Sequence, residues 1–197
     1  MNNRGVTLVE LLVVLSIIVI LAVALAFSYR GWMGRYKMEG VTKTLYMDLM
    51  DARSQAVQRD RIYFVDFPTT TQYRMSTDDS NGVDKSGGDG VFQAQANPAV
   101  PTPNTDTTQP TFPKTLEYPV TWAGGTVQFD RRGLITTAAT PNAATVCIFT
   151  DFDGDKKSDF DPDYDCIILE QTRITLGKLT KQNTDGGACD NANCVSK

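Results

Sequence analysis

Residues 1–27 read MNNRGVTLVELLVVLSIIVILAVALAF, and this stretch decides most of what the chain can form. Residues 6–27 are an apolar run in which Glu10 is the one charged side chain. At 1.5 Å per residue, a helix over this run is roughly 33 Å long, which is enough to span the hydrocarbon core of a bilayer. The sequence therefore predicts a transmembrane helix over residues 6–27.

The only processing-like site, Gly5, comes before the apolar run and not after it. A secretory signal peptide is cleaved after its apolar core, so here the hydrophobic segment would stay on the mature protein. The order of residues resembles the class III signal of type IV prepilins and pseudopilins, carried here by Gly5, Thr7, Leu8 and Glu10. The chain departs from that family in having Val6 where Phe is usual. An ordinary signal anchor that contains a glutamate is the alternative.

The resemblance implies a leader of residues 1–5, cleaved after Gly5 by a prepilin peptidase, with N-methylation of Val6. It also implies an assembly role for Glu10, which would pair with the N-terminal ammonium of a neighbouring subunit. A carboxylate within a membrane segment costs about 2.5–3.5 kcal/mol. No Lys or Arg occurs in residues 6–27 to offset this cost. We therefore expect Glu10 to be unsatisfied in the isolated subunit and ion-paired in the filament.

The helix is predicted to continue as an amphipathic segment over residues 28–61. Apolar residues recur there at steps of four and three, which is the helical period: Val41, Leu45, Leu49, Ala52 and Ala56. Three glycines, Gly31, Gly34 and Gly40, could bend or loosen the junction. We expect the second half of this helix to carry a domain formed by residues 62–197.

Residues 38–67, MEGVTKTLYMDLMDARSQAVQRDRIYFVDF, resemble the GspH/FimT type of pilin-like protein. The resemblance rests on the Ala-Arg-Ser-x-Ala run at 52–56, followed by a strand at 62–67. It implies an α+β, pilin-like fold in which the long N-terminal helix packs on an antiparallel β-sheet domain.

A polar insertion follows at residues 76–114, rich in Asp, Gly, Thr, Asn, Pro and Gln. This composition predicts a variable loop, with one short strand possible at GVFQAQ, residues 90–95. Strand signals then resume, with turns at Gly124-Gly125 and Arg132-Gly133. The predicted strands are 116–122, 126–130, 134–137, 144–150, 166–171 and 173–179.

An acidic loop, DFDGDKKSD at residues 151–159, has carboxylates at its first, third, fifth and ninth positions. Oxygen ligands at such spacing can surround Ca²⁺. The predicted ligands are the side chains of Asp151, Asp153, Asp155 and Asp159 and the carbonyl of Lys157, with Asp161, Asp163 and Asp165 available to complete the coordination. The loop lacks the bidentate glutamate of an EF-hand. We expect a structural Ca²⁺ that holds a hairpin together; a solvated acidic turn is the alternative.

The four cysteines are Cys147, Cys166, Cys189 and Cys194, and there is no histidine. An exported domain meets an oxidising compartment, which favours disulfides over a zinc site. Three pairings are possible. We favour Cys147–Cys166 across the acidic hairpin and Cys189–Cys194 within the tail.

Composition argues against several functions. The absence of histidine removes the commonest general base, and no nucleophile motif, P-loop or dinucleotide fingerprint occurs, so we predict no enzyme and no organic cofactor. A net charge of −4 opposes bulk electrostatic binding to nucleic acid. The cations nearest the carboxyl end are Arg173, Lys178, Lys181 and Lys197.

Three functions stay open. The long insertion favours a minor type IV pilin that primes or caps pilus assembly; a minor pseudopilin of type II secretion and a DNA-binding FimT-type tip pilin are the alternatives. The resemblance implies three kinds of partner: other pilins or pseudopilins, prepilin peptidase and inner-membrane assembly machinery. The expected location is the bacterial inner membrane, with the carboxyl-terminal domain outside the cytoplasm, and then the pilus or pseudopilus.

Overall fold

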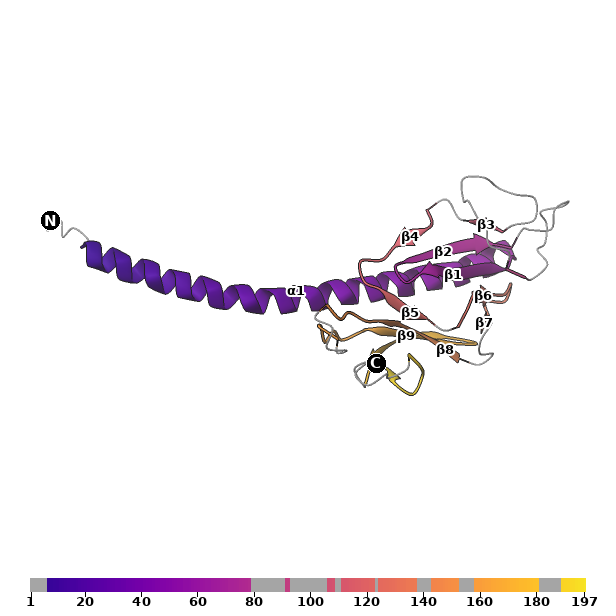
Figure 1. The fold of residues 1–197 in the computed structure, drawn as a ribbon. Coiled ribbons are helices and arrows are strands. Elements are labelled where there is room, and N and C mark those ends of the chain that lie inside the picture. The colour runs from indigo at the N-terminus through magenta and orange to yellow at the C-terminus, as the bar shows by residue number, and fades with distance from the viewer. Residues whose placement is uncertain are drawn as a thin grey trace.

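The first half of a long helix projects from one end of a β-rich domain, and its second half lies along that domain (Figure 1). The computed structural model describes residues 7–78, 91–92, 106–108, 111–122, 124–137, 143–152, 158–180 and 189–197. The helix, α1 (Leu8–Arg59), has 52 residues and is the only helix in these ranges. It ends where Asp60 adopts a left-handed conformation with φ 51°, and its N–H bonds to the Ala56 carbonyl. Within the described part of the chain, no helical segment combines the length and apolarity that crossing a membrane requires.

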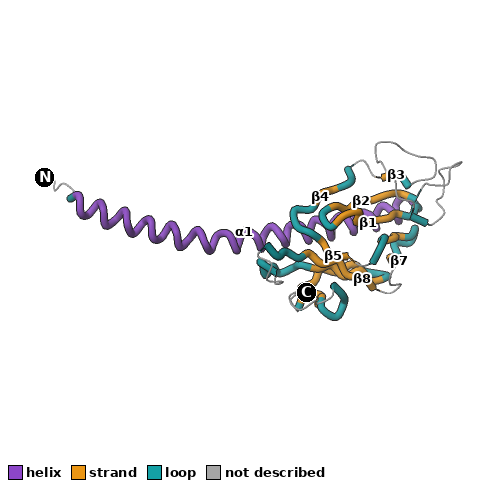
Figure 2. Tube along the Cα trace, in the orientation of Figure 1, coloured by secondary structure: helices purple, strands orange, loops and turns teal. Residues whose placement is uncertain are grey.

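The strands form two antiparallel sheets that lie along the second half of α1 (Figure 2). The six-stranded sheet runs β3-β2-β1-β6-β7, with β4 also paired to β2. Its strands are β1 (Tyr63–Thr69), β2 (Gln72–Thr77), β3 (Thr107–Thr108), β4 (Lys114–Thr115), β6 (Val127–Phe129) and β7 (Ile135–Thr137).

The five-stranded sheet has the order β11-β10-β9-β8-β5. Its strands are β5 (Val120–Trp122), β8 (Ala143–Ile148), β9 (Cys166–Glu170), β10 (Ile174–Leu179) and β11 (Cys194–Ser196). The α+β prediction is therefore confirmed, with two sheets packed on the helix.

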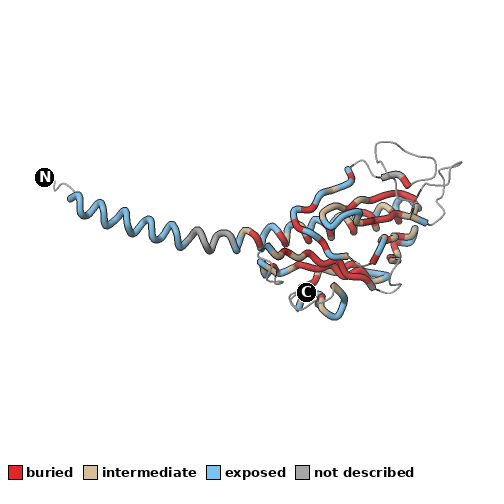
Figure 3. The backbone as a smooth tube through the Cα atoms, viewed as in Figure 1, coloured by how far each residue is buried: buried red, intermediate tan, exposed pale blue. Residues whose placement is uncertain are grey.

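One face of α1 supplies the centre of the core. Leu45, Leu49, Ala52 and Ala56 of the predicted stripe are completely buried, and Met38 extends this buried face by two turns. Figure 3 shows the change along the helix, from an exposed first half to a second half buried on its domain side. Both sheets meet this face, because side chains from each of them belong to the same core: Tyr63, Val65, Val127, Phe129, Val146, Ile148, Ile167 and Leu169.

The five-stranded sheet is buried on both faces along β9. Successive strand side chains point to opposite faces, so Ile167 and Leu169 reach the main core while Cys166 and Ile168 face away from it. The second face is covered by the chain's last residues through Cys189 and Cys194. This explains why residues 166–169 are buried without alternation.

The insertion is anchored where it returns to the domain. Lys114 of β4 pairs with Asp48 of α1 at 2.7 Å, and Asp48 also accepts a hydrogen bond from the Tyr73 hydroxyl. Burial, together with the neighbouring carboxylate, raises the pKa of Tyr73, so this phenol stays protonated. A cluster of three residues therefore joins α1, β2 and β4.

Four strands were absent from the sequence prediction: β2, β3, β4 and β11. β3 and β4 are only two residues long, and each is a strand because it pairs with β2. Of the possible strand at 90–95, Val91 and Phe92 are described and lie outside any strand, and the other residues lie outside the described ranges. Phe92 packs its ring 5.4 Å from that of Phe64.

Candidate assembly helix and acidic loop

The start of α1 is fixed by Glu10 itself. Glu10 occupies the third helical position, and its carboxylate accepts hydrogen bonds from the Thr7 backbone N–H (3.0 Å) and hydroxyl (3.1 Å). In return the Glu10 N–H donates to the Thr7 hydroxyl oxygen at 3.3 Å. This reciprocal arrangement is a capping box, which satisfies backbone donors at a helix start.

The prediction that Glu10 is unsatisfied in the isolated subunit is therefore wrong. Its oxygens have local donors, although the described residues supply no cation to it. The Thr-x-x-Glu spacing, Thr7 to Glu10, was the sequence signal that could have revealed this. Gly5 and Val6, the predicted processing residues, lie outside the described residues.

The first four turns of α1 display apolar side chains that no other described part of the chain covers. Leu8 is 76% exposed and Ile20 is 68% exposed, and the same holds along this stretch for Leu11, Leu12, Leu15, Ile18 and Leu21. Continuous apolar surface of this size indicates a site that binds lipid or protein. The helix can therefore serve as an insertion or association element.

The junction between the exposed and buried halves of α1 depends on a glycine. The ring of Phe160 lies directly on Gly34, where a Cβ atom would overlap it. Phe160 also contacts the rings of Tyr118 and Phe152, at centroid distances of 6.1 and 6.2 Å. Gly31 and Gly40 have no such neighbours. Of the three glycines predicted to loosen the junction, Gly34 instead admits a close contact.

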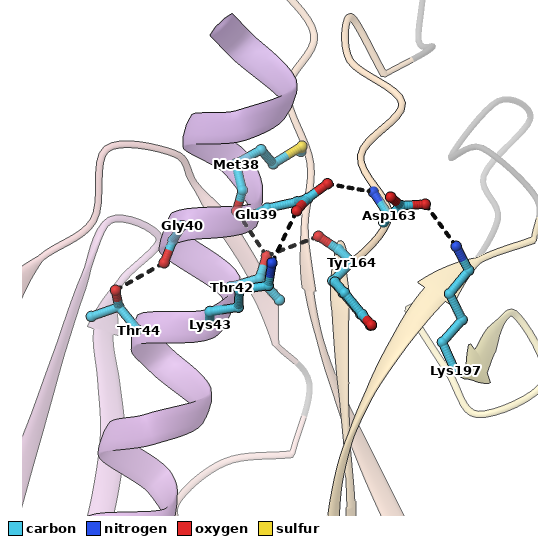
Figure 4. A network of polar contacts seen from close by, with 9 residues as sticks. All are labelled: Met38, Glu39, Gly40, Thr42, Lys43, Thr44, Asp163, Tyr164 and Lys197. Atoms are coloured by element: carbon cyan, nitrogen blue, oxygen red, sulfur yellow. Dashed lines mark hydrogen bonds and ion pairs between the residues drawn. The ribbon is translucent and has the colours of Figure 1, made fainter. Parts of the chain in front are cut away.

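A polar network holds the segment after the acidic loop against α1 (Figure 4). Glu39 pairs with Lys43 at 3.0 Å and accepts the Asp163 backbone N–H at 3.0 Å. The buried Thr42 hydroxyl lies 3.2 Å from the Tyr164 carbonyl oxygen. Asp163 pairs with Lys197 at 2.8 Å, and this interaction lowers the pKa of the Asp163 carboxyl. The end of the chain, the acidic segment and the helix are therefore tied together.

The acidic loop is closed at its base. The Asp159 carboxylate accepts the Phe152 N–H at 2.6 Å, and the Asp159 N–H donates to the Thr150 carbonyl at 3.0 Å. These bonds bring Asp159 beside the residues on either side of Asp151. The other predicted ligands, Asp153, Asp155 and Lys157, lie outside the described residues. Among the described residues, no three acidic, cysteine or histidine side chains are grouped closely enough to hold a metal ion.

The three downstream aspartates have protein partners. Asp161 pairs with Lys178 at 2.6 Å and Asp163 with Lys197. Asp165 accepts the Leu179 backbone N–H at 2.6 Å. Burial raises the pKa of this last carboxyl to about 6, against the effect of that hydrogen bond. The three carboxylates that the sequence offered as additional calcium ligands are thus bonded to protein groups in this structure.

The predicted disulfide pairing is wrong. The bonds are Cys147–Cys189 and Cys166–Cys194. Cys147 and Cys166 lie directly opposite each other on β8 and β9. Directly opposed Cβ atoms are about 4.5–5.5 Å apart, wider than the roughly 3.5–4.5 Å that a disulfide spans. Each of these two cysteines instead bonds to the tail that covers their face of the sheet.

The tail's own cysteines are directed to different strands by the turn between them. The Asp190 side chain accepts the N–H groups of Ala192 (3.0 Å) and Asn193 (2.9 Å), and its carbonyl accepts that of Cys194 (3.0 Å). Gly177 of β10 lies opposite Cys166, and a Cβ there would be 2.7 Å from the Cys194 sulfur. The Cys166–Cys194 bond can pass over β10 because this residue has no side chain.

The cations near the carboxyl end are largely neutralised. Arg173 pairs with Glu170, Lys178 with Asp161 and Lys197 with Asp163. Lys181 lies outside the described residues. Phosphate binding depends on net positive charge, and cations that are each paired with a carboxylate supply little of it, which weakens the case for nucleic-acid binding at this end.

Comparison with known proteins gives two matches. The prokaryotic N-terminal methylation motif matches residues 1–26, which include the segment around Gly5 and Glu10. The family described as type II transport protein GspH matches residues 41–161, from the buried half of α1 through the acidic loop. No curated protein and no solved structure matches the chain.

Proposed function

The chain belongs to the GspH family of type II transport proteins, and from this premise we propose that it is a minor type IV pilin that helps prime or cap pilus assembly. Proteins with this domain and this methylation motif are pilins or pseudopilins, which are structural subunits. In this proposal, prepilin peptidase cleaves after Gly5 and the amine of Val6 is methylated. The inner-membrane assembly machinery and other pilins are the partners.

The observation that carries the proposal is the division of α1 into two halves. Leu45 and Leu49 are completely buried by the domain, whereas Leu8 and Ile20 are mostly exposed. Exposed apolar surface of this extent requires a bilayer or neighbouring helices. A single-pass anchor that later joins a helical filament core supplies both environments in turn.

In this proposal Glu10 has one set of partners before assembly and gains another in the filament. Before assembly the Thr7 N–H and hydroxyl satisfy its oxygens. In the filament, the ammonium group of a neighbour's Val6 would add the charge that these neutral donors lack. Coulomb attraction between the ammonium group and the carboxylate is strong where water is excluded, so the added positive charge favours the assembled state.

We further propose that Ca²⁺ has a structural role in the acidic loop. Asp159 lies at the loop base beside Thr150 and Phe152, so binding of a cation between Asp151 and Asp159 would hold this base closed. The loop is followed at once by Phe160, which packs on Gly34. Calcium would therefore stabilise the contact between the domain and the middle of the helix.

A minor pseudopilin of type II secretion is the second candidate, favoured by the description of the matching family. A DNA-binding tip pilin is the third, but the ion pairs of Arg173, Lys178 and Lys197 argue against its use of these cations. The polar insertion at 76–114 favours a surface filament over a secretion apparatus confined to the envelope.

The test is to shear surface filaments from cells and to identify amino-terminal peptides in the sheared and membrane fractions by mass spectrometry. A peptide that begins at N-methylated Val6 in sheared filaments is the expected result for a pilin. The same peptide confined to the membrane fraction would favour the pseudopilin. An intact Met1 terminus in both fractions would contradict both functions.

A further inference from the structure

Arginines gather at the end of the domain farthest from the exposed half of α1. Arg53 and Arg59 lie on the last two turns of the helix, Arg61 follows it, and Arg131 lies in the turn between β6 and β7. We name these four residues the distal arginine cluster. None of them has an ion pair or hydrogen-bond partner through its side chain among the described residues.

The topology brings three of these four residues to the turn between β6 and β7. In the β1–β6 ladder Tyr63 faces Phe129, and continuing that register past the ladder places Arg61 beside Arg131. Gly133 follows in the same turn with φ 75°, and a Cβ there would lie 3.3 Å from the Arg53 Nε atom. Arg53 therefore rests on the turn that carries Arg131.

The carboxylate in the turn beside Arg131, Asp130, already has several partners. Asp130 accepts the backbone N–H groups of Arg132 and Leu134, each at 2.8 Å, and pairs with the Arg132 guanidinium at 3.0 Å. Burial alone would raise the pKa of Asp130, but these donors lower it overall. Asp130 thus orders the turn, and even with Asp60 between Arg59 and Arg61 the four arginines leave this end of the domain positively charged.

The opposite end of the domain has the opposite charge. Exposed carboxylates there include Asp159, Asp161 and Asp163. Lys178 and Lys197 pair with two of these carboxylates, but exposed ion pairs are weak. A neighbouring molecule therefore interacts with the net charge of this surface. Residues 158–165 contain four aspartates and no Lys or Arg. We name residues 158–165 the proximal acidic segment.

The two surfaces are far apart within one molecule. The proximal acidic segment contacts α1 at Gly34 and Glu39, and the distal arginine cluster begins on the same helix at Arg53. At 1.5 Å per residue, Glu39 and Arg59 are about 30 Å apart along the axis. A direct contact between the two surfaces must therefore join different molecules.

We propose that the distal arginine cluster of one copy of this chain binds the proximal acidic segment of a second copy, head to tail. Arginine forms bidentate bonds with carboxylates and is enriched at protein interfaces. A contact between two different surfaces does not close on itself as a two-fold dimer does, and it can repeat along a filament. The inference rests on the proposed function as a filament subunit and adds the domain surfaces that meet.

The test uses the full chain in detergent micelles and calcium-free buffer, so that no cation occupies Asp159, together with a carbodiimide, which joins amines to carboxylates that are in direct contact. Arg61→Lys and Arg131→Lys keep the charge and supply the amine. Mixing copies labelled with ¹⁴N and ¹⁵N distinguishes links between molecules from links within one. The expected links join the amine introduced at position 61 or 131 to Asp159 or Asp161 of the other copy, and they decrease several-fold in 0.5 M salt because of screening.

Arg173→Lys is the matched control, because Arg173 is paired with Glu170 of its own chain and should link only there. Arg61→Glu should abolish links made by Arg131→Lys, and Asp161→Arg in the partner copy should restore them. Copies that associate through α1 without any distal-to-proximal link would overturn the inference while leaving the proposed function intact. Links that persist in Arg61→Glu would overturn it as well.

Discussion

Phe160 packs against the backbone of α1 at Gly34, so that the aromatic ring occupies the space of the missing side chain. This contact joins the end of the acidic loop to the point where the exposed half of the helix becomes the buried half. At this junction, close packing of the domain on α1 therefore requires a residue without a Cβ atom.

Gly34→Ala should destabilise the domain. The added methyl group overlaps Phe160, and overpacking of this kind costs about 1–3 kcal/mol. Alanine also favours helix over glycine by about 1 kcal/mol, which offsets part of the loss. The free energy of unfolding of the full chain in micelles, measured with urea, gives the net effect.

Gly31→Ala and Gly40→Ala are the matched controls for this substitution. Neither glycine has a neighbour within 4 Å of the added methyl group, so both variants should gain up to about 1 kcal/mol. A Gly34→Ala variant as stable as these two would show that the Phe160 contact does not constrain the helix.

The disulfides attach the tail to two strands, and each should matter for stability. Cys147–Cys189 and Cys166–Cys194 close loops with sequence separations of 42 and 28. Loops of this size predict a loss of roughly 3–4 kcal/mol when either bond is removed by a Cys-to-Ser pair. Peptide mapping under non-reducing conditions should recover these two pairs and no Cys147–Cys166 peptide.

Gly177→Ala should selectively impair the bond that crosses it. A Cβ at this position would lie 2.7 Å from the Cys194 sulfur and 3.1 Å from the Cys166 sulfur. Free thiol should appear at Cys166 and Cys194, as measured by alkylation and mass spectrometry, while Cys147–Cys189 forms. Equal alkylation of all four cysteines would instead indicate general unfolding.

The long helix and most strands could be predicted because the spacing of apolar residues along the chain is a local property of the sequence. The stripe through Leu45 and Leu49 has the helical period, and the buried run of β9 is apolar. The first four residues of β2 also alternate, with Tyr73 and Met75 more buried than Gln72 and Arg74, before Ser76 and Thr77 are buried in succession. Its signal was available, but its polar residues made it resemble the start of the insertion.

The disulfide pairing could not be predicted because it depends on the path of the tail in space. Local sequence favours Cys189–Cys194, which are close in the chain. The structure instead folds the tail across β10, a path permitted by Gly177 and the turn at Asp190. The partners of Asp161 and Asp163 follow from the same fold, since Lys178 and Lys197 reach them only after β10 and β11 have formed.

Calcium should stabilise the chain if the acidic loop binds it. At a Ca²⁺ concentration 100 times the dissociation constant, one site adds about 2.7 kcal/mol to the free energy of unfolding. Asp151→Asn should abolish the rise in Tm, whereas Asp163→Asn should retain it because Asp163 is paired with Lys197. Differential scanning calorimetry after chelation, with Mg²⁺ as the comparison ion, makes the measurement. An equal rise with both ions, or one that survives Asp151→Asn, would rule out this site.

The buried Asp165 should make stability depend on pH in a direction unusual for a carboxyl. Burial raises its pKa to about 6, above the ordinary value of 3.8, with smaller opposing effects from the Leu179 N–H and Lys178. The folded chain therefore holds this proton more tightly than the unfolded chain. Its contribution to stability is complete below about pH 4 and is lost as the pH rises through about 6.

Asp165→Asn isolates this effect, since its side-chain oxygen can still accept the Leu179 N–H. The variant and the parent should be similarly stable near pH 4, and the variant should become more stable by on the order of 2 kcal/mol at pH 7. Urea unfolding of both chains from pH 4 to 7.5, with chelator present, measures the difference. Carboxyls with lowered pKa, such as Asp163 and Glu170, give the opposite slope, but they are common to both chains and cancel. A difference that does not change with pH would mean that Asp165 is ionised in the folded protein as readily as in the unfolded chain.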